Sequence, residues 1–216
     1  MTTPTTGIAI ERDLALRVAA DRLAAEFDRI GRETIERFLD SSYEHVADGA
    51  RIETFLPLMA ERFARQRLRA LARVEHEHDH GTPTVLFVCP DNAARSLMAL
   101  ALVEHLAGDG AVAWSAGARP APGIDPAVVE AMAERGIDLS EEFPKPWTDE
   151  IVDAADVVVT MGGASCPVRR GARHESWPVW VPDGELSIDA ARRVRDELEE
   201  RIRDLLARLG VRDVSA

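Results

Sequence analysis

Cysteine is scarce in this chain, since only Cys89 and Cys166 occur among its 216 residues. Two thiols are too few for the disulfide framework of a small secreted domain, so we expect both to be reduced and either catalytic or inert. Long apolar runs are also missing, because no stretch approaches the roughly 20 apolar residues that cross a bilayer. The N-terminus carries no basic-then-apolar secretion pattern either. The sequence therefore predicts a cytoplasmic protein without a membrane partner.

Positive charge is in deficit, because 26 basic residues against 38 acidic ones leave a formal net charge of −12. Lysine is nearly absent and occurs only as Lys145. A nucleic-acid partner would require a basic face, so this balance argues against one.

The first third of the chain is predicted to be helical. Apolar residues recur at helical spacing in three sets between residues 11 and 73, with breaks at Gly31 and Gly49 and with Pro57 in the first turn of the third helix. A three-helix bundle of this size buries too little surface to be stable alone. We expect residues 11–73 to pair with a second copy in a homodimer; a solvated helical appendage is the alternative.

A polar linker, EHEHDHGTP, follows at residues 75–83 and contains His76, His78 and His80. Histidines at i, i+2 and i+4 do not face one way on a helix, so we expect a hydrated hinge and neither a metal ion nor another cofactor. The linker divides the chain into a helical domain, residues 1–80, and a second domain, residues 81–216.

From Thr84 onward, short apolar runs alternate with helical patterns. Strands are predicted at residues 84–88, 111–116, 157–160 and 176–180, and helices at 95–106, 125–136 and 194–209. This alternation predicts an α/β domain with a four-stranded parallel sheet and helices on both faces. Ligands of such sheets bind beyond the carboxyl ends of the strands.

Cys89 directly follows the first predicted strand and opens the segment CPDNAARS. A turn from a strand into a helix N-terminus aims backbone N–H groups and the positive end of the helix dipole at one point. That point fits an oxyanion clamped by a guanidinium, and the same field favours a thiolate, to which a neighbouring hydroxyl can donate. The predicted oxyanion site comprises Asp91, Asn92, Ala93, Ala94, Arg95 and Ser96.

The pattern VLFVCxxNxxRSxMA resembles the opening of low-molecular-weight tyrosine phosphatases and of the arsenate reductases related to them. Similar segments follow in the same order: Ser115-Ala116-Gly117, PAVVEAMAERGIDLS, AADVVVTMG, Cys166-Pro167 and RVRDEL. The middle segments are more similar to the arsenate-reductase branch. The N-terminal helices resemble a three-helix dimerisation module found ahead of such domains.

The resemblance implies a low-molecular-weight phosphatase fold and a thiol-dependent arsenate reductase. In that branch the loop cysteine, here Cys89, attacks arsenate, and a second cysteine then attacks the first and releases arsenite. Cys166 matches the last cysteine of the family pattern and is the candidate second thiol; an inert core cysteine is the alternative. A low-molecular-weight thiol or a thioredoxin-type reductant would then reduce the disulfide.

Two departures from the family pattern concern the later chemical steps. Relatives carry a cysteine at or just after the position of Gly162, so here either Cys166 attacks Cys89 directly or a small thiol completes the reaction. Relatives also carry a general-acid Asp before a Pro, where this chain has Val181. Asp183, beyond that Pro, is the remaining candidate acid, and an ordinary turn residue is the alternative.

Two further departures concern the loop itself. Pro90 has no N–H and removes one donor. Asp91 places a carboxylate beside the anion site, pointing either into it or out to solvent.

Arsenate chemistry is favoured, because arsenate oxygens exchange easily and need less help from a general acid than a phosphate monoester does. A low-molecular-weight protein tyrosine phosphatase is the second hypothesis, with Trp147 or Trp180 as an aromatic wall. The third is a catalytically impaired dimer that binds an oxyanion or a protein partner.

Overall fold

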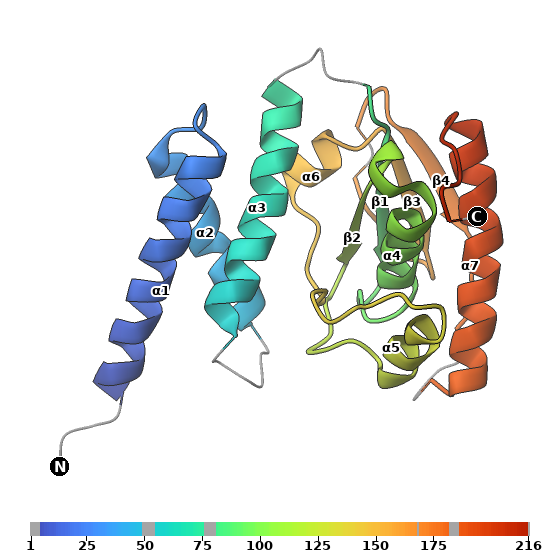
Figure 1. Cartoon of the computed structure of the whole chain (residues 1–216), viewed down its shortest axis with the longest axis horizontal. Helices are drawn as coiled ribbons and strands as arrows, with labels where there is room; N and C mark the ends of the chain where they lie inside the picture. Colours follow the sequence, from blue (N-terminus) through green and yellow to red (C-terminus); the bar gives the residue numbers. More distant parts are fainter. Residues whose placement is uncertain (1–4, 49–54, 76–80, 168, 182–185, 216) are drawn as a thin grey trace. The chain divides into compact units, whose positions relative to one another are not determined.

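The structure is a computed structural model that describes residues 5–48, 55–75, 81–167, 169–181 and 186–215. The chain divides into two compact units, Met1–Glu75 and His76–Ala216 (Figure 1). The predicted boundary between residues 80 and 81 stays a prediction, because residues 76–80, with the three linker histidines, lie outside the described ranges.

Three helices form the first unit: α1 (Thr5–Glu26), α2 (Arg32–Ala47) and α3 (Leu56–Glu75). Each contacts the other two, and their apolar faces bury Leu23, Ile35 and Phe63 completely. Pro57 is the second residue of α3, where the missing N–H costs no helical hydrogen bond. The predicted helical bundle is therefore confirmed, whereas the predicted break at Gly49 lies outside the described residues.

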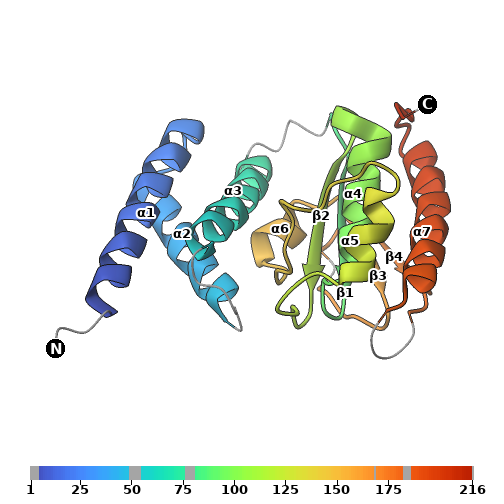
Figure 2. The same ribbon diagram turned by 60° about the horizontal axis from the view of Figure 1, so that its bottom comes forward.

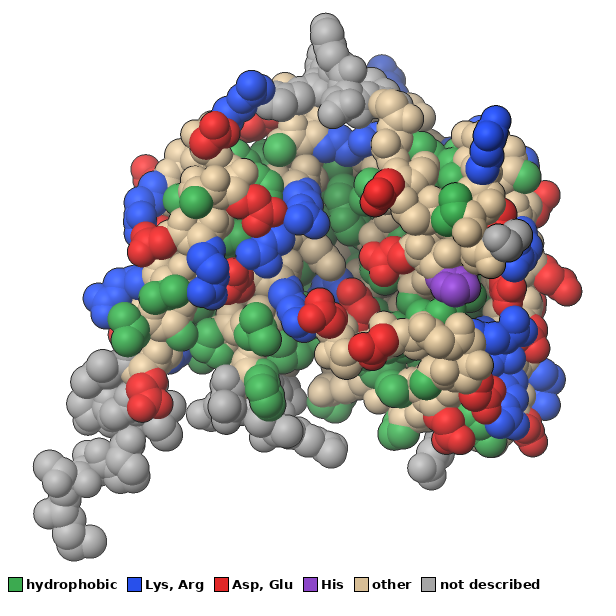
Figure 3. Space-filling model, viewed as in Figure 1, with side chains coloured by type: hydrophobic (Ala, Val, Ile, Leu, Met, Phe, Trp, Pro, Cys, Tyr) green, Lys and Arg blue, Asp and Glu red, His purple; other side chains and the backbone are tan. Residues whose placement is uncertain are grey.

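Ion pairs tie α1 to α3. Arg22 of α1 and Arg65 of α3 both donate to the carboxylate of Glu61, which is only 4% exposed. Burial alone would raise the pKa of Glu61, but the two guanidinium hydrogen bonds outweigh it and lower the pKa. Figure 3 shows acidic and basic side chains interspersed along these helices.

The second unit is built on a four-stranded, fully parallel sheet with the order β2-β1-β3-β4. The strands are β1 (Thr84–Cys89), β2 (Val112–Gly117), β3 (Val157–Met161) and β4 (Arg173–Trp177). Every residue of the central strands β1 and β3 is buried, as expected for short, continuous apolar runs. The parallel four-stranded sheet predicted from the sequence is confirmed.

One strand boundary is wrong in the prediction. The expected strand 176–180 begins three residues earlier as β4, whose sequence RHESW is mostly polar and exposed. β4 is an edge strand, and most of its side chains stay exposed. The apolar residues on which the prediction relied begin only near its last residue, Trp177.

Helices cover both faces of the sheet. The helix α4 (Arg95–Ala107) contacts β1, β2 and α7 (Ile188–Arg208), and α7 also contacts α5 (Pro126–Ala133). The short α6 (Asp149–Asp153), which was not predicted, lies on the opposite side of the sheet (Figure 2). A single 3-10 turn, η1 (Gly108–Gly110), links α4 to β2. Among the described helices, none combines the length and apolarity needed to cross a membrane.

Candidate active site

The loop between β1 and α4 lies at the carboxyl end of the sheet. Cys89 is the last residue of β1 and lies in register with Gly117, the last residue of β2. Its fully buried side chain is thus at the edge where parallel sheets bind ligands. Arg95 begins α4, so residues 90–94 form the turn from strand to helix.

The carbonyl groups of this loop are turned outward. Those of residues 89, 90, 91 and 93 accept hydrogen bonds from backbone amides in the segment 118–125, at 2.8–3.1 Å. A planar trans peptide directs the next N–H opposite to its carbonyl, so the amides of residues 91, 92 and 94 point to the concave side. This arrangement suits an oxyanion, and Pro90 leaves it one donor short.

The thiol of Cys89 ends a buried chain of polar groups. Its Sγ lies 2.9 Å from Ser96 Oγ, and Asn92 Nδ2 donates to the same Oγ at 2.7 Å. Because the Ser96 oxygen already accepts from Asn92, its own hydrogen is available to the sulfur. All three side chains have no exposed surface. A hydroxyl that donates to the sulfur stabilises negative charge on Cys89, whereas the Asp91 carboxylate, 3.5 Å from the same sulfur, opposes it.

Asn92 also fixes the shape of the loop. Its φ of 49° lies in the left-handed region, which Asn tolerates better than most residues. Its Oδ1 accepts a hydrogen bond from the backbone N–H of Lys145 at 2.9 Å. A Cβ on Gly117 would approach the Asn92 backbone N to 2.9 Å, so β2 must end in glycine for the loop to pack against it.

The guanidinium of Arg95 lies directly over Gly162. A Cβ at residue 162 would fall 2.2 Å from Arg95 Nη1, so a side chain there would have to displace the guanidinium. Nη1 donates to the Val179 carbonyl at 3.3 Å, while the buried Nε has no hydrogen-bond partner among the described residues. At, or just before, the position where the family pattern has a cysteine, this chain thus has a glycine that leaves room for the Arg95 guanidinium.

The Asp91 carboxylate is turned into the loop. Its Oδ1 lies 3.5 Å from Cys89 Sγ and accepts a hydrogen bond from the backbone N–H of Ala93 at 3.3 Å. Of the two orientations that the sequence left open, the structure has the inward one.

A cleft of about 780 Å³ opens in front of the loop. Its walls come from the loop residues Pro90, Asp91, Ala93, Ala94 and Arg95, from Gly162 and Gly163 after β3, and from Asp125, Leu186 and residues 176–181 at the end of β4 and beyond. Trp177 and Trp180 both line it, and Trp180 is 72% exposed at its edge. Trp147, which we considered as an aromatic wall, is not among the described lining residues.

The groups expected to serve the later steps are placed less favourably. Cys166 follows β3 as a free, half-buried thiol, and burial raises its pKa to about 11. Neither Cys166 nor the fully buried Cys89 is among the described residues that line the cleft. Val181 lines the cleft, but its side chain has no ionisable proton to donate. Asp183 lies outside the described residues.

Three contributors to the site were not identified from the sequence: the Gly162 surface, the Val179 carbonyl and the Lys145 amide. Two of them are backbone groups, which any residue type can supply. The sequence drew attention to Gly162 only because the family pattern has a cysteine at or just after this position.

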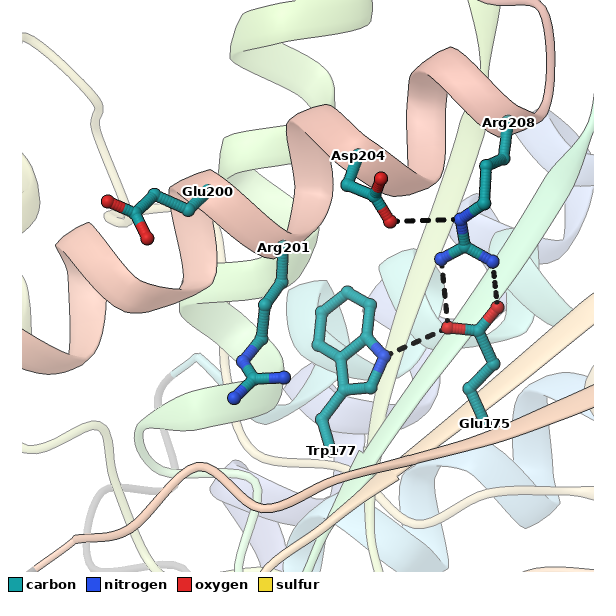
Figure 4. A pocket seen from close by; sticks show the side chains of 6 residues that line it. All are labelled: Glu175, Trp177, Glu200, Arg201, Asp204 and Arg208. Carbon is teal, nitrogen blue, oxygen red and sulfur yellow. Dashed lines mark hydrogen bonds and ion pairs between the residues drawn. The ribbon is translucent and has the colours of Figure 1, made fainter.

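A second cavity of about 410 Å³ lies between β4 and α7 (Figure 4). Both of its arginines are already paired, because Arg208 binds the carboxylates of Glu175 and Asp204, and Arg201 binds Glu197. Trp177 Nε1 also donates to Glu175 at 3.0 Å. The ion pairs of this cavity connect β4 to α7. Both arginines of its described lining are therefore already neutralised by carboxylates and are not available to bind an anion.

Comparison with known proteins gives matches over both units. Residues 16–72 match the protein-tyrosine-phosphatase-like N-terminal domain, and residues 84–215 match low molecular weight phosphotyrosine protein phosphatases. The solved structure of the thioredoxin-dependent arsenate reductase Cg_ArsC1' from Corynebacterium glutamicum is 40% identical, with a TM-score of 0.80 over 90% of this chain and 96% of that one.

Two curated relatives match a part of the chain. A putative arsenate reductase of Halobacterium salinarum is 33% identical over 125 residues, which are 55% of this chain and 87% of that protein. The probable low molecular weight protein-tyrosine-phosphatase EpsP of Ralstonia solanacearum is 42% identical over 82 residues, which are 38% of this chain and 57% of EpsP. The chain therefore belongs to the low molecular weight phosphotyrosine protein phosphatase family.

Proposed function

We propose that this chain is a thiol-dependent arsenate reductase in which Cys89 is the nucleophile. The observation that carries the proposal is the buried Cys89–Ser96–Asn92 chain in the turn between β1 and α4, where Arg95 lines the adjoining cleft. The similarity to an arsenate reductase along nearly the whole chain supports the same chemistry.

In the first step the Cys89 sulfur attacks the arsenic atom of dihydrogen arsenate. An S–As bond forms, one As–OH bond breaks, and the leaving oxygen departs as water with the proton of the thiol. Arg95 and the loop amides of residues 91, 92 and 94 hold the remaining oxygens, whose negative charge increases during the attack.

In the second step another thiol attacks Cys89 Sγ. A disulfide forms, the S–As bond breaks, and its electron pair reduces arsenic(V) to arsenic(III), which leaves as arsenous acid after protonation. The attacking thiol is either Cys166 or an external low-molecular-weight thiol. A thioredoxin-type reductant then restores Cys89, as the name of the Corynebacterium relative states for that protein.

The residue at the general-acid position favours arsenate over phosphoprotein substrates. Val181 cannot protonate a leaving group, and a missing general acid costs a hydrolase about 10²–10⁴ in rate. Arsenate tolerates this loss because its oxygens exchange readily.

A low molecular weight protein tyrosine phosphatase is the second candidate. Trp180, 72% exposed in the cleft lining, favours it, because an aromatic ring of a substrate could stack on this side chain. Hydrolysis of p-nitrophenyl phosphate that depends on Cys89 and exceeds the rate of arsenate reduction would favour this function.

A single-turnover experiment tests the proposal. The fully reduced chain is mixed with one equivalent of arsenate, with and without a small thiol, and the products are identified by intact-mass and peptide mass spectrometry. A Cys89–Cys166 disulfide identifies Cys166 as the second thiol, whereas arsenite that appears only with added thiol identifies an external one. The absence of adduct, oxidation and arsenite under both conditions would rule out a reductase. Cys89→Ser and Cys166→Ser serve as matched controls.

We also infer a homodimer through residues 11–73. Leu14 and Val18, one turn apart on α1, are 55% and 42% exposed, and such a pair of apolar side chains suits a partner helix. Light scattering with size exclusion should give twice the chain mass, and Leu14→Glu with Val18→Glu should give the monomer. Val129→Glu, which charges an equally exposed valine of the second unit, should leave the mass unchanged.

A further inference from the structure

The charges around the cleft are unusual for a site that binds anions. Of the described lining residues, the charged ones are Asp91, Asp125 and Arg95, so two carboxylates stand against one guanidinium. The Asp125 carboxylate is engaged as the N-cap of α5, where it accepts from the Ala127 amide at 2.9 Å. Asp91 is the carboxylate of this cleft that lies beside the Cys89 sulfur, at 3.5 Å.

Geometry brings Asp91 into the reaction space. Its Oδ1 is 3.5 Å from Cys89 Sγ, and the residue lines the cleft. An oxyanion attacked by Cys89 must place its central atom in contact with the sulfur. One of its oxygens can then come within hydrogen-bond distance of the Asp91 carboxylate.

The proton content of the anion decides whether this contact attracts or repels. A carboxylate that faces a bare anionic oxygen is destabilised by like charge and by the absence of a donor. A hydroxyl in the same place donates a short, charge-assisted hydrogen bond. A site built around a required hydrogen bond rejects the analogue that lacks the donor more strongly than a site built on size alone.

We propose that Asp91 makes the loop selective for an oxyanion that keeps a hydroxyl group. Inorganic arsenate and phosphate retain at least one hydroxyl at neutral pH. A phosphate monoester loses its last proton near pH 6 and then has none to donate. Asp91 thereby narrows the substrate class to free inorganic oxyanions, an inference that rests on the proposed function of this site.

A purely structural role of Asp91 is the alternative, in which its carboxylate only caps the Ala93 N–H. The change Asp91→Asn separates the two roles, because an amide oxygen still accepts from Ala93 while the negative charge is lost. Asp125→Asn is the matched control, since it removes the same charge from the same cleft and keeps an N-cap acceptor for α5.

The test measures phosphate and sulfate binding to the full chain carrying Cys89→Ser, by titration calorimetry at neutral pH. Both anions are tetrahedral and similar in size, but sulfate carries no proton there. We expect phosphate to bind at least about 10-fold more tightly than sulfate, and the ratio to fall about 10-fold on adding Asp91→Asn. Adding Asp125→Asn instead should change the ratio less than about threefold, because that carboxylate faces α5.

Equal affinities for the two anions, a ratio unaffected by Asp91→Asn, or no measurable phosphate binding would overturn the proposal. Arsenate reduction is assayed separately on the chain with Cys89 intact. A chain that discriminates phosphate from sulfate but never reduces arsenate would overturn the proposed function and leave the role of Asp91 standing.

Discussion

The two cysteines lie in regions of the site that are built very differently. Around Cys89, the turn from β1 to α4 buries the thiol, Ser96 and Asn92 and joins them by short hydrogen bonds. Cys166, after β3, has a half-buried side chain, and this burial raises the pKa of its thiol to about 11.

This difference indicates which step the fold itself must perform. Attack on an oxyanion requires a thiolate, a clamp and donors held in fixed positions, and only a packed loop provides them. Resolution of the adduct requires one more thiol, and a diffusible molecule can deliver it. The region around Cys89 is therefore built to bind and attack the oxyanion, whereas an external thiol can take the place of Cys166.

The largest predicted effect comes from exchanging one thiol at a time. Cys89→Ser should lower arsenate reduction at least about 10⁴-fold, because the nucleophile is lost. Cys166→Ser should lower it less than about 10-fold when a small thiol is supplied. Steady-state arsenite formation measures both. Equal losses in the two variants would show that both regions are indispensable and would break the contrast between them.

The reactivity of Cys166 sharpens the comparison. A pKa of about 11, against an ordinary value of 9.0, leaves about 100-fold less thiolate at neutral pH. Iodoacetamide should therefore alkylate Cys166 about 100-fold more slowly than an exposed thiol peptide at pH 7. The rate should keep rising until pH approaches 11, because only the thiolate reacts. Peptide mass spectrometry follows the residue, and a plateau below pH 9 would contradict the burial seen around it.

Sequence reasoning placed Cys89, Arg95 and Ser96 together because the order strand, Cys-x5-Arg-Ser, helix leaves the chain few other geometries. The same reasoning did not find that the Arg95 guanidinium packs on Gly162. A glycine has no side chain, so the sequence does not show which group fills the space beside it. It did not find the Val179 carbonyl either, because every residue type has a backbone carbonyl and the sequence does not show which one accepts a hydrogen bond. Contacts between loops far apart in sequence have to be seen in the fold.

The third prediction concerns the arginine clamp. Gly162→Ala should push the guanidinium of Arg95 off its surface and lower kcat/KM for arsenate by roughly 10- to 100-fold, below the full loss of an oxyanion donor. Gly163→Ala is the matched control, because Gly163 also has a positive φ, of 73°, but nothing lies within 4 Å of its added Cβ. Similar losses in both variants would attribute the effect to backbone strain instead of the clamp.

The smallest predicted effect tests whether the hydroxyl of Ser96 stabilises the Cys89 thiolate. Ser96→Ala removes a hydrogen bond to a charged group, which contributes about 1.5–3 kcal/mol, so alkylation of Cys89 at pH 7 should slow by at least about 10-fold. Ser115→Ala is the control, because Ser115 is also buried, at 2% exposure, yet its Oγ has no hydrogen-bond partner among the described residues. If both variants slow the reaction equally, the effect is one of packing around β1 and β2, and Cys89 would owe its reactivity to the loop amides and the helix dipole alone.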